Sequence, residues 1–285
     1  MLAQMKRYSL FLGCTIPASQ IFVEKAMKLV GEKLGIELKD VEGATCCPEP
    51  EISKTVSYDG WLRVAARNLS LAEQSTNAMC LICSGCYATF SKANKALSNP
   101  ETLKEINNQL HLVKRSYNHG VKVMNVIELL HDDIGIEKLK ASFVKHMDSI
   151  RIATHPGCRI LHENTLVQKM TDLIMATGAS VVEWKEQEMC CGVPSMYNDP
   201  EFALNERAKR KVEGVKGVGP DCMVVVCPAC YDMLEKAEIS FIDPEQFIPI
   251  VNLVELLALA MGFSADEIGM DLHRIQVSPL LEKIV

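Results

Sequence analysis

The sequence of 285 residues lacks any long, uninterrupted hydrophobic run. Its longest apolar stretch, FIPIVNLVELLALAMGF at 247–263, has 17 residues and contains Asn252 and Glu255. A helix that spans a bilayer needs about 20 predominantly apolar residues, so we interpret this stretch as a buried amphipathic helix. The opening MLAQMKRYSLFLGC has no long apolar core and no small-residue cleavage site. It predicts a first β-strand and not a signal peptide.

Basic residues are also in short supply. Lysine and arginine together number 30 against 36 acidic residues, which gives a formal net charge of −6. Binding to nucleic acid requires a basic face, so this balance disfavours that class of protein. The glycine-rich motifs of nucleotide sites are missing as well, because GVKGVG at 214–219 has the wrong spacing and no P-loop is present. We therefore expect the chain to bind neither flavin, nicotinamide nor ATP.

Cysteine, by contrast, is abundant, with 12 residues. Disulfide frameworks belong mainly to small secreted domains with little core. This chain is large, 48% of its residues are hydrophobic, and no secretion signal is recognisable. We therefore expect a cytoplasmic protein whose clustered cysteines are metal ligands or redox groups.

Ten of the cysteines form an internal repeat. Each half has one cysteine, then 31 residues, an adjacent pair, 35 further residues and a C-x-x-C, and all five positions recur at an offset of 144 residues. The first set is Cys14, Cys46, Cys47, Cys83 and Cys86, and the second is Cys158, Cys190, Cys191, Cys227 and Cys230. This regularity indicates a duplicated domain. We place the two copies at 1–147 and 148–285, the second with a C-terminal tail.

Two further cysteines, Cys80 and Cys222, lie outside the repeat. We expect both to be small buried residues in strands. Cys80 completes a C-x-x-C-x-x-C run with Cys83 and Cys86, but Phe90 stands where a ferredoxin has its next cysteine. A ferredoxin site is therefore rejected.

A second echo pairs VMNVIELL at 123–130 with IVNLVELL at 250–257, at an offset of 127 residues. The first copy therefore carries about 17 more residues than the second, by the difference between the two offsets. We expect these residues in a polar helix within 99–120.

Strand and helix patterns alternate in each half. Strands are expected at 7–14, 36–43, 77–86, 149–158, 179–186 and 221–230, and helices at 18–35 and 58–76. Such alternation predicts an α/β fold with parallel sheets and right-handed crossovers. We expect two tandem, duplicated, Rossmann-like βαβαβ domains related by pseudo-twofold symmetry. Each cysteine group follows a predicted strand, so the groups should converge at the carboxyl edge of a sheet.

Five cysteines in each half restrict the choice of metal site. Structural zinc takes four ligands, often from two C-x-x-C motifs, and a disulfide network would leave an odd cysteine and a strained adjacent pair. A cubane iron–sulfur cluster uses four thiolates. An irregular iron–sulfur cluster accommodates the fifth if one thiolate bridges two irons. Zinc and purely structural cysteines stay open as alternatives.

The tandem C-x(31)-C-C-x(35)-C-x-x-C pattern, with FLGC at 11–14 and GCY at 85–87, resembles the cysteine-rich CCG domain. Its two-copy form resembles the B subunit of heterodisulfide reductase from methanogenic archaea. This resemblance implies two non-cubane 4Fe–4S clusters, one held by each cysteine set. It also implies that the mixed disulfide of coenzyme M and coenzyme B is reduced between them. Each cluster would take one sulfur, and two electrons would arrive one at a time.

The resemblance further implies two partners from the same heterodisulfide reductase: its ferredoxin-like C subunit and its flavin-containing, electron-bifurcating A subunit. Hydrogenase or formate dehydrogenase subunits would belong to the larger assembly. Leu280, Leu281 and Ile284 in the tail either dock such a partner or pack on their own domain. The competing hypothesis is an iron–sulfur electron-transfer subunit of another CCG-type complex that acts on a different disulfide, thiol or organic acid.

Two features depart from the repeat or the family pattern. The first copy has C-C-P at 46–48 where the second has C-C-G at 190–192, and VPSMYNDP follows the second in place of a glycine-rich run.

His155, three residues before Cys158, is a candidate proton donor to the product thiolates. Its counterpart at the 144-residue offset is Phe11, so an ordinary hydrogen-bonded histidine is the alternative.

Overall fold

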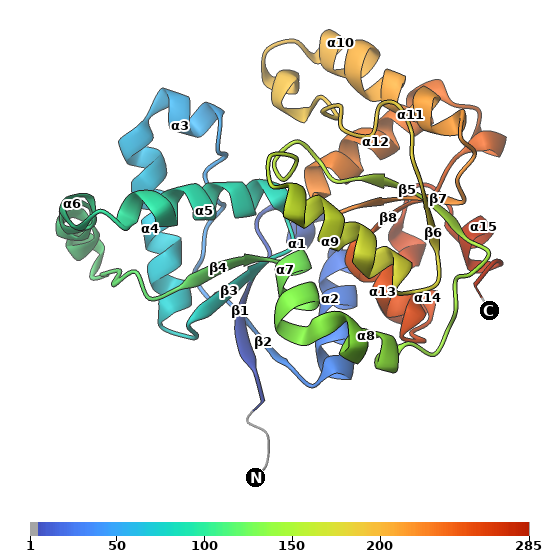
Figure 1. Cartoon of the computed structure of the whole chain (residues 1–285). Coiled ribbons are helices and arrows are strands. Elements are labelled where there is room, and N and C mark those ends of the chain that lie inside the picture. Colours follow the sequence, from blue (N-terminus) through green and yellow to red (C-terminus); the bar gives the residue numbers. More distant parts are fainter. Residues whose placement is uncertain (1–4, 285) are drawn as a thin grey trace.

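The computed structural model describes residues 5–284 and contains two parallel four-stranded sheets, one in each half of the chain (Figure 1). The first has the order β2 (Glu37–Asp40), β1 (Arg7–Phe11), β3 (Ala78–Leu81) and β4 (Lys122–Asn125). The second has the order β6 (Ser180–Val182), β5 (Arg151–His155), β7 (Cys222–Val225) and β8 (Ile250–Asn252). All six strand pairings are parallel. The α/β fold and its duplication are confirmed.

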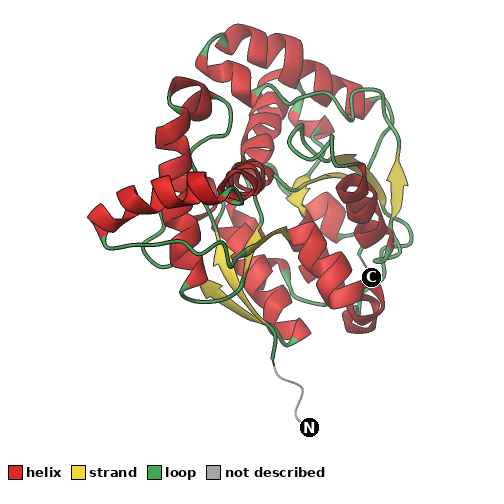
Figure 2. Ribbon diagram, turned by 60° about the vertical axis from the view of Figure 1, so that its left-hand side comes forward, coloured by secondary structure: helices red, strands yellow, loops and turns green. Residues whose placement is uncertain are grey.

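Helices enclose both sheets (Figure 2). Those of the first half are α1 (Thr15–Ser19), α2 (Ile21–Leu34), α3 (Ile52–Val56), α4 (Tyr58–Glu73), α5 (Ser84–Leu97), α6 (Pro100–Leu110), α7 (Val126–Glu128) and α8 (Ile136–Ser142). Those of the second are α9 (Asn164–Met175), α10 (Pro200–Phe202), α11 (Lys209–Lys216), α12 (Pro228–Phe241), α13 (Leu253–Ala260), α14 (Ala265–Ile268) and α15 (Ser278–Leu281). The additional polar helix expected within 99–120 is α6. Among the helices of residues 5–284, none has the length and apolarity needed to cross a bilayer.

The fourth strand of each sheet corrects the three-strand expectation. β4 and β8 come from the two segments of the second echo, and 247–263 is therefore not one helix. Asn252 ends β8 and caps α13: its side chain accepts from Val254 N at 3.2 Å, while Glu255 accepts from Asn252 N at 2.8 Å. Every residue of α13 is buried, including Glu255, so this helix has no face exposed to solvent, as expected for a helix enclosed on every side.

The two halves share one hydrophobic core. Helix α2 of the first half packs against α13 of the second, and α9, the repeat counterpart of α2, packs against α7. Figure 1 shows α2, α9 and α13 between the two sheets. This reciprocal packing gives the interface its pseudo-twofold symmetry. The boundary near residue 147 falls between α8 and β5 and stays a prediction.

The C-terminal tail packs on its own chain. Leu280 and Ile284 are buried and Leu281 is half-buried, and α14 contacts α2 of the first half. The tail therefore contributes to the core, and Leu280 is not available to dock a partner. Cys80 and Cys222 are fully buried in β3 and β7, which confirms that expectation.

The capping role of Asn252 at α13 can be tested by substitution. Asn252→Ala removes a buried cap acceptor and is expected to lower the free energy of unfolding by about 1–2 kcal/mol, measured by urea denaturation. Asn252→Ser keeps an oxygen acceptor and should lose less. Equal losses in both variants would contradict a capping role.

Candidate metal centre

The C-x-x-C motifs lie in the first turns of two helices and not at strand ends. β3 stops at Leu81 and β7 at Val225, while Cys83 and Cys227 are the N-cap residues of α5 and α12. Residues three apart on a helix share a face, so both thiols of each motif point the same way. The predicted strands extended too far along the sequence. The apolar residues run on from the strand into the helix, so the sequence pattern does not mark where the strand ends.

The two cysteine sets line one cavity of about 210 Å³ between the halves. Its wall contains nine of the ten repeat cysteines: Cys14, Cys46, Cys47, Cys83 and Cys86 from the first set, and Cys158, Cys191, Cys227 and Cys230 from the second. The remaining member, Cys190, is half-buried, with its Sγ 3.8 Å from that of Cys158. All twelve cysteines are free thiols. Convergence at a sheet edge was predicted from the strand pattern, and a shared site between the two cysteine sets was expected from the family resemblance; the cavity lies between them.

Each adjacent pair of cysteines turns its two thiols toward different partners. The second member meets the last cysteine of the set, with Sγ–Sγ distances of 2.9 Å for Cys47–Cys86 and 3.3 Å for Cys191–Cys230. The first member of the second pair faces the lone cysteine of its set, as Cys190 does with Cys158. In the first pair, Cys46 Sγ donates to the carbonyl oxygen of Cys47 at 3.2 Å, and hydrogen bonding with Cys47, then burial and then the neighbouring Cys14 raise the pKa of Cys46. The second adjacent pair therefore joins the two ends of its five-thiol group.

In the pairs Cys47–Cys86 and Cys227–Cys230, one thiol is favoured as the metal-binding thiolate, whereas the pKa of its hydrogen-bonded partner is raised. Hydrogen bonds from Cys230 and Cys83, together with backbone N–H groups at the start of α12, hold the pKa of Cys227 well below its usual value. Hydrogen bonds with Cys46 and Cys86 lower the pKa of Cys47 to about 5. A helix N-terminus stabilises a thiolate in the same way. The thiols of Cys83 and Cys227 also interact across the halves, so the two sets meet in the middle of the cavity.

Two basic residues hold the loops that carry the adjacent cysteines. Arg67 Nη2 donates to the carbonyl of Gly43 at 3.0 Å, and Lys211 Nζ donates to that of Gln187 at 3.3 Å. Both donors and both acceptors are related by the 144-residue offset. Lys211 is fully buried beneath the Trp184 ring, 4.5 Å from its centroid, and burial lowers its pKa to about 8. These paired contacts were not predicted, although comparison of basic residues at the repeat offset pairs Arg67 with Lys211.

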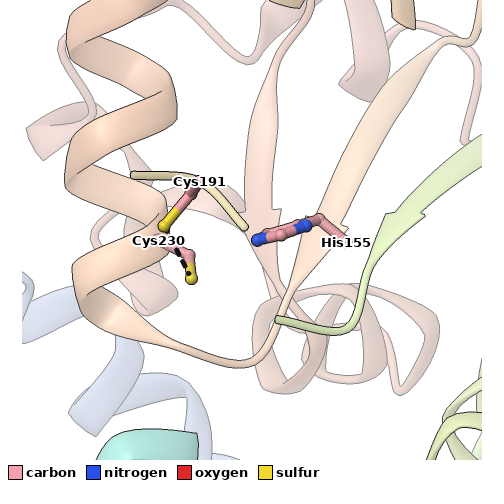
Figure 3. Close-up of side chains that lie close together, drawn as sticks. All are labelled: His155, Cys191 and Cys230. Carbon is pink, nitrogen blue, oxygen red and sulfur yellow. Dashed lines mark hydrogen bonds between the residues drawn. The ribbon is translucent and has the colours of Figure 1, made fainter. Parts of the chain in front are cut away.

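His155 ends β5 and lies at the second cysteine set. Its side chain is buried, its Nδ1 is 3.4 Å from the carbonyl oxygen of Gln187, and its ring lies beside Cys191 and Cys230 (Figure 3). Burial, and then the charge of Lys211, lower its pKa to about 3. The imidazole is therefore neutral in this setting, and its role as a proton donor stays a prediction.

The charged residues of the cavity wall are not symmetric. Arg159 of the second half pairs with Glu49 Oε1 at 2.8 Å and with Glu51, both from the first half. The repeat counterparts of Arg159 and Glu49 are Thr15 and Val193, which also line the cavity. Symmetric thiols and asymmetric charges allow the cavity to distinguish the two ends of a bound molecule.

Comparisons with known proteins agree with this architecture. The cysteine-rich CCG domain family matches residues 8–91 and 152–235. The B subunit of the ferredoxin/F(420)H(2)-dependent CoB-CoM heterodisulfide reductase of Methanosarcina acetivorans is 32% identical, over 98% of this chain and 97% of that protein. The 8-methylmenaquinol:fumarate reductase membrane anchor subunit of Wolinella succinogenes is 26% identical, over 96% and 99%.

A crystal structure of a hypothetical protein from Helicobacter pylori has the same fold, with a TM-score of 0.77 at 19% identity. It is matched over 95% of this chain, which spans about half (52%) of that structure. The chain belongs to the cysteine-rich CCG domain family and carries the domain twice. It is therefore an iron–sulfur redox subunit of the CCG type. Over nearly its whole length it is similar to the B subunit of heterodisulfide reductase.

The turn after Cys191 can be tested with matched glycine substitutions. Gly192 has φ +103°, and a Cβ there would lie 2.6 Å from the backbone oxygen of Ala203. Gly192→Ala is therefore expected to destabilise the protein by about 1–3 kcal/mol, measured by chemical denaturation followed by circular dichroism. Gly85→Ala is the control, because its Cβ would lie 3.5 Å from Cys83 Sγ and Ala229 occupies the equivalent position. Comparable destabilisation in both variants would show that the turn is not constrained as described.

Proposed function

We propose that this chain is the catalytic subunit of a heterodisulfide reductase. It would reduce the CoM-S-S-CoB disulfide to the thiols of coenzyme M and coenzyme B at two non-cubane 4Fe–4S clusters. The observation that carries the proposal is the shared cavity, whose wall contains thiols of both repeats. A disulfide placed there lies within reach of both cysteine sets. The proposed ligands are Cys14, Cys46, Cys47, Cys83 and Cys86 for one cluster, and Cys158, Cys190, Cys191, Cys227 and Cys230 for the other.

The side chains present fit such clusters. The two sets hold ten free thiols, nine of which line one cavity, and closely spaced thiols meet at 2.9 to 3.8 Å. Zinc would use four of the thiols in each set and leave a fifth without a role. When bound, iron–sulfur clusters supply electrons singly, which a disulfide accepts twice, together with two protons, to give two thiols.

The protein contributes position and polarity to this reaction. Its two halves hold the cysteine sets around one cavity, in whose wall Cys83 of the first half lies next to Cys227 of the second. Arg159 is the basic residue among those that line the cavity. An anionic group on one half of the disulfide can pair with Arg159 in place of Glu49, whereas the other half meets Val193 and Pro194. This arrangement orients an unsymmetrical disulfide.

In this role the chain depends on other proteins for electrons. We propose a cytoplasmic complex with the ferredoxin-like C subunit and the flavin-containing A subunit of heterodisulfide reductase, and with hydrogenase or formate dehydrogenase as further components. The similarity to a fumarate reductase subunit supports a second candidate, an electron-transfer protein that serves another substrate. Both repeats keep all five cysteines, which favours the catalytic role.

Metal analysis separates these candidates from a zinc protein. Anaerobically purified protein is expected to contain about eight irons per chain, the sum for two four-iron clusters. Addition of coenzyme M or coenzyme B thiol under oxidising conditions should produce a paramagnetic signal in EPR. Two zincs without iron would exclude the proposal, and full iron content with a spectrum indifferent to thiol would favour electron transfer alone.

A pair of cysteine variants tests the ligand assignment. Cys191→Ser should remove about half of the iron, because it weakens one five-thiol group and leaves the other intact. Cys80→Ala should keep all of it, because Cys80 is buried in β3 away from the cavity wall. The measurement is iron per chain after anaerobic purification. Iron loss in the Cys80 variant, with Cys191→Ser unaffected, would reverse the assignment.

A further inference from the structure

The two cysteine sets differ at the end of the central strand of each sheet. Phe11 ends β1 in the first half, and His155 ends β5 in the second, at the same position of the repeat. Both side chains are buried. The duplication thus preserves the thiols and replaces an inert ring by one with two nitrogen atoms.

Hydrogen bonding assigns the ring proton of His155. Its Nδ1 faces the carbonyl oxygen of Gln187 at 3.4 Å, the same oxygen that accepts from Lys211 Nζ at 3.3 Å. A carbonyl oxygen can only accept, so Nδ1 carries the proton. Nε2 then presents its lone pair on the opposite side of the ring.

His155 Nε2 is buried and has no hydrogen-bond partner among residues 5–284. A buried polar atom without a partner is unfavourable and calls for an explanation. The metal-binding groups near this ring are the thiols of Cys191 and Cys230, whose Sγ atoms lie 3.3 Å apart. One ring nitrogen and these two sulfurs all lie within 4.8 Å of one another, and Figure 3 shows the ring directed at the two thiols.

We propose that His155 Nε2 is an iron ligand of the second cluster, next to Cys191 and Cys230. This inference rests on the proposed iron–sulfur function. A histidine that binds a metal commonly donates its other N–H to a backbone carbonyl, which fixes the tautomer and the ring orientation. His155 has this arrangement, and Lys211 holds the carbonyl in place. Phe11 cannot coordinate, so the first cluster has thiolate ligands alone.

The consequence is that the two clusters are chemically inequivalent. Nitrogen ligation alters the electronic properties of an iron–sulfur centre, as in centres where histidine replaces cysteine. The buried cation Lys211 adds to the difference, because its counterpart Arg67 is only half-buried. An incoming disulfide would therefore meet two distinct centres and not two copies of one.

Histidine labelling of the holoprotein tests this ligand without a mutation. The protein is produced with natural or 15N-labelled histidine, purified anaerobically and studied by pulsed EPR in its paramagnetic state. We expect one strongly coupled nitrogen whose spectrum changes on labelling, in the signal of one cluster and not of the other. Full iron content without a histidine-dependent coupling, or with only the weak coupling of a hydrogen-bonded ring, would overturn the proposal.

Two variants then locate the nitrogen. His155→Phe reproduces the first-half residue and should abolish the coupling, whereas the exposed His162→Gln in the same loop region should retain it. Coupling that survives in His155→Phe would assign the ligand elsewhere and refute the inference. Protein without iron would refute the proposed function itself, and iron analysis of the same samples distinguishes the two failures.

Discussion

The packing of α2 against α13 across the pseudo-twofold axis determines the distance between the two cysteine sets. A hydrogen bond ties this interface directly to the site: Gln20, the residue before α2, donates through Nε2 to the carbonyl of Pro228 at 2.9 Å. Pro228 follows Cys227 and begins α12. Because α13 is buried on all sides, the second sheet cannot move relative to α2 without exposing apolar surface. A rigid shared core thus keeps thiols from both repeats around a single cavity.

Some features of the site are repeated in both halves and others are not. The duplication preserves every repeat cysteine and the contact from a basic side chain to the loop before each adjacent pair, through Arg67 and Lys211. It does not preserve the charges of the cavity wall or the residue that ends the central strand. The cavity therefore combines matching thiols from both halves with a wall whose charges differ between the halves.

Much of this arrangement could be predicted from the sequence because its spacing survives duplication. The 144-residue offset located both sheets, and the alternation of elements placed the cysteines at one edge. The strands β4 and β8 were missed because each leads directly into a helix, so its short apolar run merges with the helical pattern. The pairing of Arg159 with Glu49 was also beyond prediction, since it depends on how the two halves face each other and not on either half alone.

The adjacent cysteines illustrate what spacing cannot specify. In a regular strand, neighbouring side chains point to opposite faces, and one of the two would be lost to the site. Neither pair lies in a strand: both lie in loops, and at the second pair Gly192, at φ +103°, allows the backbone to turn sharply. Cys191 can then face Cys230 while Cys190 faces Cys158. The irregular backbone thus lets two consecutive cysteines contact the two ends of one five-thiol group.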